Sequence, residues 1–381
     1  MTKNPFRPTF GVPPLLWVGR QSILDDFELG LLSGPGAMDR SMVISGTRGI
    51  GKTVLLNELE ETAQKQGWVT LRTSGRAQMV EELTNTSIPA QLRELDPPQK
   101  SRISRVNVSA LGGIGIDYQG DDSVTPTLNT RLRELVGKLT GVGVLITIDE
   151  VQDASAQDLT DIAVAYQDLL RDEMDVALVM AGLPEGVDRL LDLPGATFLR
   201  RAQRHVLGPF SEANSSHAFS STAQGSGREF TDSAIQAAVR LSQGYPFLVQ
   251  LTGAFSWAWA MKRGSVVIEP QDVEAISGRA VSAMGNQVHA PAVKSLPFAS
   301  REFLTALAGL TGPTAGTAGN PPVAMADIAR ELGKPAKSLS DVRHRLIVAD
   351  LIEPCGTGKV RFVLPYMSDY LLGTGMAQKV D

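Results

Sequence analysis

A phosphate-binding loop near the start of the chain constrains its fold more than any other feature. Residues 46–53 read Gly-Thr-Arg-Gly-Ile-Gly-Lys-Thr, an uninterrupted G-x-x-x-x-G-K-T sequence. An apolar run at 42–44 precedes the loop and a helical segment at 54–59 follows it. This strand–loop–helix order is typical of a phosphate site, because the glycines let backbone N–H groups converge at the positive end of a helix.

Each loop residue has an expected role in binding ATP or GTP with Mg²⁺. Six residues are expected to present backbone N–H groups to the phosphates: Gly46, Thr47, Arg48, Gly49, Ile50 and Gly51. Lys52 is expected to contact the β- and γ-phosphates as a point charge, and the Thr53 hydroxyl to ligate Mg²⁺. The alternative is a glycine-rich turn with a solvated lysine, which leaves the acidic strand end at 149–150 unexplained.

That acidic strand end is the second nucleotide-site element. Residues 144–148 are apolar or β-favouring and lead into Asp149 and Glu150. Such a run predicts a strand buried on both faces of a parallel sheet, with Asp149 at the carboxyl edge where these sheets bind ligands. Asp149 is expected to hold Mg²⁺ through water or Thr53, and Glu150 to orient or deprotonate the attacking water. The alternative for Glu150 is an ordinary helix-start carboxylate.

Composition narrows the class of protein. A length of 381 residues predicts two or three domains, and 43% hydrophobic residues suffice for real cores. The single Cys355 excludes an intrachain disulfide framework and fits a reducing compartment. No signal peptide is apparent, and polar residues interrupt the richest apolar stretch, 247–261, so we expect a cytoplasmic protein without a membrane partner. The net charge of −5 argues against indiscriminate nucleic-acid binding.

The order of patterns predicts an α/β fold followed by helices. We expect an N-terminal arm at 1–25, a P-loop ATPase core at 26–210, a helical lid at 211–288 and a further domain at 297–375. Strands are expected at 42–44, 68–71, 144–148, 176–181 and 205–207, alternating with helices in a doubly wound parallel sheet. The range near 75–131 reads as an insertion, and segments 103–108 and 112–115 favour an added hairpin.

Several motifs together carry a family resemblance. In chain order they are Gly-Arg at 19–20, the phosphate loop, Asp-Glu-Val-Gln at 149–152, Met-Ala-Gly-Leu-Pro at 180–184, Arg-Arg-Ala-Gln-Arg at 200–204 and Gly-Tyr-Pro at 244–246. The chain resembles AAA+-related P-loop ATPases of the branch shared by origin-recognition-type initiators, archaeal-type ATPases and STAND signalling ATPases. The resemblance covers about residues 12–375 and implies a C-terminal winged helix.

The resemblance also implies further site residues. Gly19 and Arg20 are expected near the adenine and ribose, and Pro246 is expected to pack against the nucleotide from the lid. One of three arginines is expected to stabilise charge on the γ-phosphate, within the subunit or on a neighbouring copy: Arg200, Arg201 and Arg204. The alternatives are a helix stop at Pro246 and a solvated face for the arginines.

Two departures from the family pattern favour a nucleotide-gated switch over a fast motor. The expected fourth strand ends Val-Met-Ala-Gly at 179–182, without the polar residue that many AAA+ enzymes place near the attacking water. Hydrolysis is therefore expected to be slow. The lid offers Gly-Tyr-Pro at 244–246 where initiator ATPases usually carry an arginine.

The last domain is expected to be a winged helix-turn-helix. Its helices are expected at 301–310, 325–332 and 338–349, and a glycine turn at 356–358 joins the two strands of a wing. Six residues are candidates for contacts with double-stranded DNA: Lys337, Ser340, Arg343, Arg345, Lys359 and Arg361. However, nine basic and eight acidic residues nearly balance after residue 297, so contact with a protein partner or a second copy stays an alternative. The two functions left open are an ATP-controlled DNA binder and a STAND-like signalling ATPase.

Overall fold

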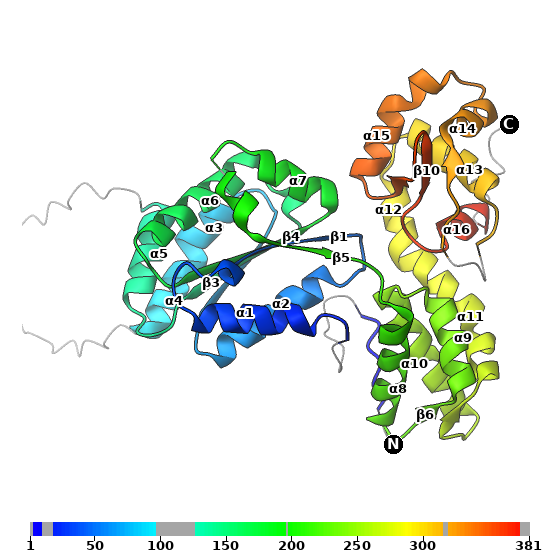
Figure 1. Cartoon of the computed structure of the whole chain (residues 1–381), viewed down its shortest axis with the longest axis horizontal. Helices are drawn as coiled ribbons and strands as arrows, with labels where there is room; N and C mark the ends of the chain where they lie inside the picture. The colour runs from blue at the N-terminus through cyan, green and yellow to red at the C-terminus, as the bar shows by residue number, and fades with distance from the viewer. Residues whose placement is uncertain (1–2, 10–17, 97–125, 196, 315–318, 374–381) are drawn as a thin grey trace, which may run out of the picture.

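The computed structural model describes residues 3–9, 18–96, 126–195, 197–314 and 319–373. Figure 1 shows three parts: an α/β part, a bundle of helices beside it, and a smaller C-terminal part above the bundle. The order of these parts along the chain is the order expected from the sequence. The expected hairpin at 103–115 lies outside the described residues.

A parallel sheet forms the centre of the α/β part. Its five strands run in the order β2-β3-β4-β1-β5, and every pair is parallel. They are β1 (Ser41–Gly46), β2 (Val69–Ser74), β3 (Val144–Asp149), β4 (Val176–Gly182) and β5 (Gln203–Leu207). All seven residues of β4 are buried, as their apolar sequence requires in a sheet covered on both faces. The predicted doubly wound α/β sheet is confirmed.

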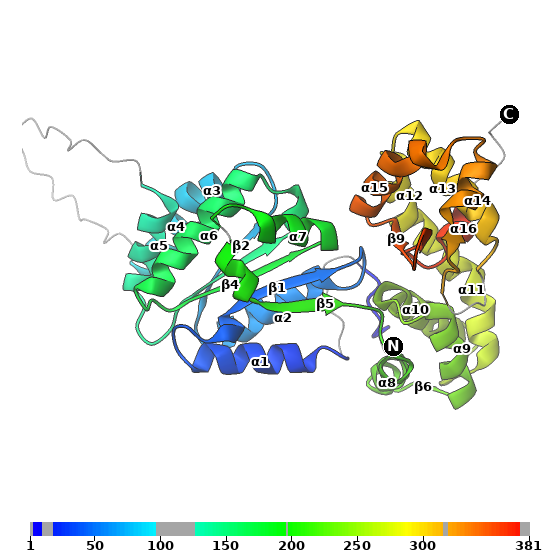
Figure 2. The ribbon, with the colours of Figure 1, turned by 45° about the horizontal axis from the view of Figure 1, so that its top comes forward.

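Helices cover both faces of this sheet, as Figure 2 shows. Side chains from alternate strand positions contact different helices: Met42 and Ile44 belong to the core with α1 and α2, whereas Val43 belongs to the core with α5, α6 and α7. The helices are α1 (Gln21–Leu32), α2 (Lys52–Lys65), α5 (Leu128–Gly137), α6 (Ala156–Arg171) and α7 (Pro184–Asp192). α1 begins inside the range expected as an N-terminal arm, because the apolar residues Ile23, Leu24 and Phe27 pack into this core.

The range 75–131, expected as an insertion, contributes helices to the core wherever it is described. α3 (Met79–Glu82), a π-helical turn (Leu83–Ser87) and α4 (Ile88–Leu95) follow β2. Met79, Leu83 and Ile88 are buried with α5 and α6. These segments are therefore part of the core of the α/β part.

The bundle beside the sheet contains α8 (Glu212–Gln224), α9 (Asp232–Ser242), α10 (Pro246–Lys262) and α11 (Pro270–Met284), with the short parallel pair β6 (Glu229–Phe230) and β7 (Val267–Ile268). The N-terminal segment 3–9 lies against it. Phe6 is buried between Phe219 and Phe230, over Gly253 of α10, where any Cβ would lie 2.3 Å from the Phe6 ring. The Arg7 N–H donates to the side chain of Gln250 at 2.9 Å.

α11 continues through a π-helical turn (Gly285–His289) into α12 (Ala290–Lys294) and so connects the bundle to the C-terminal part. That part contains α13 (Phe298–Thr311), α14 (Met325–Glu331), α15 (Ser340–Val348) and α16 (Met367–Gly373). Its antiparallel sheet has the order β8-β10-β9, from β8 (Val323–Ala324), β9 (Ile352–Pro354) and β10 (Lys359–Phe362). Three helices and a hairpin thus occur at the positions that the sequence predicts.

The C-terminal part contacts both other parts. The Tyr366 hydroxyl donates to the carbonyl of Leu241 at the end of α9, at 2.8 Å. α15 lies against α7 of the ATPase core, on the side of the sheet where the strands end. The carboxyl edge of the sheet is therefore bordered by the bundle and by the C-terminal part.

Candidate nucleotide site

The phosphate loop turns tightly between β1 and α2. Gly49 and Gly51 have φ of 73° and 99°, values that favour glycine. α2 begins at Lys52, whose side chain is buried and donates from Nζ to the carbonyls of Gly46 at 2.9 Å and Thr47 at 3.1 Å. Burial lowers the pKa of Lys52, and the carboxylates of Glu150, Asp350 and Asp149 oppose that shift. The lysine is thus held at the loop, where a phosphate would lie.

Thr53 and Asp149 come together as the sequence predicts. The Thr53 hydroxyl donates to Asp149 Oδ2 at 2.5 Å, and the second Asp149 oxygen accepts from the N–H of Glu150 at 2.9 Å. Burial raises the pKa of Asp149, although the bond from Thr53 opposes the shift. A hydroxyl and a carboxylate oxygen side by side are hard donors of the kind that Mg²⁺ prefers. The residues therefore fit a Mg²⁺ ion beside the loop.

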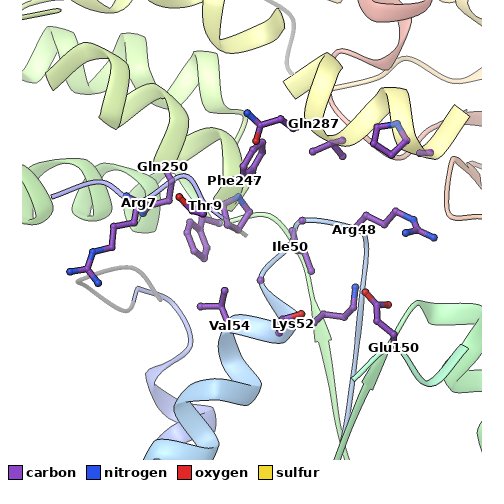
Figure 3. A pocket seen from close by; sticks show the side chains of 18 of the residues that line it. Arg7, Thr9, Arg48, Ile50, Lys52, Val54, Glu150, Phe247, Gln250 and Gln287 are labelled. Atoms are coloured by element: carbon purple, nitrogen blue, oxygen red, sulfur yellow. The ribbon is translucent and has the colours of Figure 1, made fainter. Parts of the chain in front are cut away.

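Glu150 projects from the end of β3 into a cavity, and Figure 3 shows its carboxylate and the Lys52 ammonium group pointing toward each other. Its backbone is left-handed, with φ of 54°, so the chain turns sharply after the strand. Gly75 permits this turn, because a Cβ there would lie 2.1 Å from the Glu150 carbonyl oxygen. The fold thus directs Glu150 at the space above the loop.

Gln152, to which sequence reasoning gave no role, contacts Glu150. Its side-chain amide donates to the Glu150 carboxylate, and its amide oxygen accepts from the N–H of Leu183 at 3.0 Å. Leu183 directly follows β4, the strand that ends without a polar side chain. The only signal in the sequence that could have indicated a role for Gln152 was its place two residues after Glu150.

The cavity has a volume of about 740 Å³ and lies between the phosphate loop and the helical bundle (Figure 3). Its apolar end is lined by Val18, Phe210, Ala218, Pro246 and Phe247. Its size and its apolar wall fit a purine base next to the phosphate loop. Pro246, at the first turn of α10, lines this cavity.

Arg20 lines this cavity, and Gly19 directly precedes it in the chain. Arg20 donates to the Gly208 carbonyl at 2.7 Å and lies over the Phe210 ring, 5.6 Å from its centroid. Gly19 packs closely against Asn214, where a Cβ would lie 2.5 Å from the side-chain nitrogen. Arg20 thus supports the wall of the cavity through Phe210, and Gly19 allows α8 to approach.

The three candidate arginines do not line the cavity among the described residues. Arg200 donates to the Leu191 carbonyl at 2.9 Å and pairs with Asp192 at 3.0 Å, at the end of α7. Arg201 and Arg204 are exposed, and Arg204 lies within β5 and not before it. The structure therefore brings none of them to the phosphate loop of the same chain.

Asp350, which no sequence motif indicated, reaches the loop from the C-terminal part. This buried carboxylate accepts from the backbone N–H of Arg48 through Oδ2 at 3.1 Å. Burial raises its pKa to about 6, although the Arg48 bond and the charge of Lys52 oppose the shift. Beside it, the buried hydroxyl of Tyr245 approaches Gly49, where a Cβ would lie 2.5 Å from that oxygen. A second cavity, of about 850 Å³, borders Asp350 between α7 and the C-terminal part.

The candidate DNA contacts divide into two groups. Lys337, Ser340 and Lys359 are exposed and Arg343 is half-buried, and none of their side chains forms an ion pair with a described residue. Arg361 instead pairs with Glu353 at 2.6 Å and lines the cavity that faces the ATPase core. Arg345 donates to the Ser300 hydroxyl at 3.5 Å. The exposed basic side chains of the first group are therefore Lys337, in the 3-10 turn Ala336–Leu339 directly before α15, and Lys359, in the hairpin.

The described residues contain neither a membrane-spanning helix nor a cluster of histidine, cysteine and carboxylate metal ligands. No helix there is long and apolar enough to cross a membrane. No group of three or more histidine, cysteine, aspartate or glutamate residues there could hold a metal ion.

Comparison with known proteins agrees with this geometry. A family model described as an AAA ATPase domain matches residues 16–180, and a model described as a domain of unknown function matches residues 286–371. No curated protein sequence matches the chain.

Solved structures match nearly the whole chain at low identity. The Aeropyrum pernix ORC2 protein is 14% identical over 97% of both chains, with a TM-score of 0.62. Cdc6p from Pyrobaculum aerophilum is 16% identical over 98% of this chain and 97% of its own, with a TM-score of 0.49. The RuvB branch migration motor of Thermotoga maritima is 16% identical over 93% and 95%, with a TM-score of 0.47. The chain therefore has the AAA+ fold of this ORC2 protein, and its residues 16–180 are similar to an AAA ATPase domain.

Proposed function

We propose that this protein is an ATP-dependent switch that hydrolyses ATP slowly and whose C-terminal domain is released from the phosphate loop when ATP binds. The observation that carries the proposal is the hydrogen bond from the Arg48 N–H to the Asp350 carboxylate. This bond joins the loop that would hold the phosphates to the C-terminal domain, and its two residues are 302 positions apart in the chain. It gives the nucleotide a direct means of changing domain position.

The switch follows from competition for one donor. Loop N–H groups are the ligands of the phosphates, and the Asp350 carboxylate takes one of them. ATP brings several negative charges to the same place, so it both competes for the donor and repels the buried carboxylate. Binding of ATP and docking of Asp350 therefore disfavour each other, and the coupling is reciprocal.

The remaining site residues have roles in hydrolysis. Lys52 and the loop N–H groups hold the phosphates, and Thr53 and Asp149 hold Mg²⁺, which neutralises phosphate charge when bound. Glu150 orients and deprotonates the attacking water. The rate is slow because β4 ends in glycine and offers no side chain to the water. The nucleotide complexes of the Aeropyrum pernix protein, with ADPNP and ADP, are consistent with this assignment.

The competition is tested by titrating ATP calorimetrically into Asp350→Ala. The affinity should rise by about tenfold, within the usual range of coupling between sites. Asp341→Ala is the matched control, because Asp341 is an exposed carboxylate at the start of α15 and should leave the affinity unchanged. Lys52→Ala should remove most ATP affinity, because it deletes a charge-assisted contact.

Domain release is tested by distance measurement. Spin labels at Asp188 on α7 and Asp341 on α15, with Cys355 replaced by serine, report the separation of the core and the C-terminal domain. ADPNP should lengthen that distance in otherwise wild-type protein but not in Lys52→Ala. An unchanged ATP affinity in Asp350→Ala together with an unchanged distance would refute the switch.

Two outputs of this switch fit the C-terminal domain. We interpret its three helices and hairpin as a winged helix, and Lys337, Arg343 and Lys359 as its contacts with double-stranded DNA. The alternative is a STAND-like signalling role, in which the same domain contacts a protein partner or a second copy. DNA binding is favoured by the exposed basic side chains that form no ion pair with a described residue, and in the docked arrangement α15 contacts α7. Release from the core would therefore control either output.

A further inference from the structure

We propose that Gln152 is a positioning residue for hydrolysis, which holds the Glu150 carboxylate toward the attacking water in place of the polar side chain missing from β4. The inference rests on the proposed ATPase function. Its basis is a continuous chain of hydrogen bonds from the Leu183 N–H, through the Gln152 amide, to the Glu150 carboxylate.

The orientation of the Gln152 amide is fixed by its partners. A backbone N–H can only donate, so the amide oxygen must face Leu183 N, at 3.0 Å. The amide nitrogen must then face Glu150, and an ionised carboxylate can only accept. Both ends of the side chain are thereby satisfied in a single orientation.

The backbone around Gln152 makes room for this arrangement. At the end of β4, a Cβ on Gly182 would lie 2.5 Å from Val151 Cγ2 and 2.9 Å from the Gln152 amide oxygen. In the first turn of α7, a Cβ on Gly186 would lie 2.4 Å from that of Gln152. Arg189, also on α7, donates to the Gln152 carbonyl at 2.6 Å. The side chain is thus held in a slot formed by β4 and α7.

The slot matters to hydrolysis because it holds Gln152 beside the Glu150 carboxylate. Glu150 lies on a left-handed turn, and its carboxylate is only half-buried, so the backbone alone leaves the side chain several rotamers. The bond from Gln152 restrains one carboxylate oxygen and leaves the other free to accept a proton from water. A polar side chain on β4 would approach the same region from the strand, but β4 ends in glycine.

The test compares variants of matched shape. Gln152→Met keeps the length of the side chain but makes neither hydrogen bond, and Gln152→Glu keeps the bond from Leu183 but cannot donate to Glu150. Both should lower kcat by about 10- to 100-fold, as small displacements of a catalytic group do. KM and the ATP dissociation constant should stay unchanged, because Gln152 does not line the nucleotide cavity.

Gln157→Met is the matched control, because Gln157 is an exposed glutamine on α6 that bonds only to Asp161 among the described residues. Its kcat should equal that of the wild type. The decisive comparison is the double variant Glu150→Gln, Gln152→Met. If Gln152 acts through Glu150, the second substitution adds no further loss to the first.

The outcomes separate the two proposals. Wild-type kcat in Gln152→Met, or multiplied losses in the double variant, would overturn the role of Gln152 while leaving the ATPase assignment intact. Wild-type kcat in Glu150→Gln would remove Glu150 as the base and Gln152 with it. A lowered thermal unfolding midpoint with unchanged kcat in Gln152→Met would reduce Gln152 to a packing residue.

Discussion

At the scale of the residue, the site combines groups that a local motif specifies with groups that only the fold brings in. Lys52, Thr53 and Asp149 were predictable, because the spacing of a phosphate loop and an acidic strand end encodes their roles locally. Asp350 was not, because it lies in no motif, and Tyr245 was not, because the Gly-Tyr-Pro motif at 244–246 predicted a contact only for Pro246. Their contact with the loop depends on how the C-terminal part and the bundle fold back.

The raised pKa of Asp350 gives the docked contact a pH dependence. The pKa rises from 3.8 to about 6, so the protonated carboxyl is the form that the docked arrangement favours. The stabilisation is full below pH 3.8 and is lost as the pH rises through about 6. Arg48 and Lys52 of the loop and Glu353 of β9 are the charges that act on it.

Asp350→Asn should abolish this dependence, because a neutral amide oxygen still accepts from the Arg48 N–H. Relative to wild type, the variant should gain thermal stability between pH 4 and pH 7, by at most about 3 kcal/mol for a shift of this size. Scanning calorimetry of both proteins across that range checks the sign. A stability difference that does not change with pH would show that the Asp350 carboxyl titrates normally.

At the scale of the element, periodicity predicted most of the sheet and the C-terminal helices. β1, β3 and β4 contain apolar runs between helical segments, and their type follows from that pattern. β2 and β5 are more polar, and their ends differ from the predicted ones by a few residues. Sequence reasoning placed no helix boundary at Gln21, and it treated α3 and α4 as an insertion. In both cases, the role of the apolar residues could be assigned only from the structure, which shows the core into which they pack.

The junction of β4 with α7 is sensitive to added volume. Gly182→Ala would place a Cβ 2.5 Å from Val151 Cγ2, so Val151 or the strand end must move. We expect a loss of about 1 to 3 kcal/mol in stability, the usual cost of overpacking, together with reduced hydrolysis through displacement of Gln152. Gly137→Ala, in α5 with nothing within 4 Å of its Cβ, should change neither. Thermal unfolding and ATPase assays of both variants measure this contrast.

At the scale of the whole molecule, three parts meet around the nucleotide cavity and each contributes to it. The core supplies the loop, the bundle supplies Pro246 and Phe247, and the C-terminal part supplies Asp350 to the loop and Ala349 to the cavity wall. A nucleotide at this place contacts, or competes with, all three. Sequence alone indicated the order of the parts but not this convergence, because the interfaces are formed by residues far apart in the chain.

A DNA-binding assay tests whether nucleotide binding at this site controls the C-terminal part. If ATP releases the C-terminal part, ADPNP should increase affinity for double-stranded DNA, since α15 no longer lies against α7. Arg343→Ala should then weaken binding and reduce the slope of log affinity against log salt by about 0.9, the contribution of one phosphate contact. Arg171→Ala removes the same charge from α6 of the core and should leave the slope unchanged. ATP affinity should be the same in both variants, because neither side chain lines the nucleotide cavity. Absence of DNA binding at low salt with ADPNP, ADP and no nucleotide would instead favour the signalling alternative, in which this surface contacts protein.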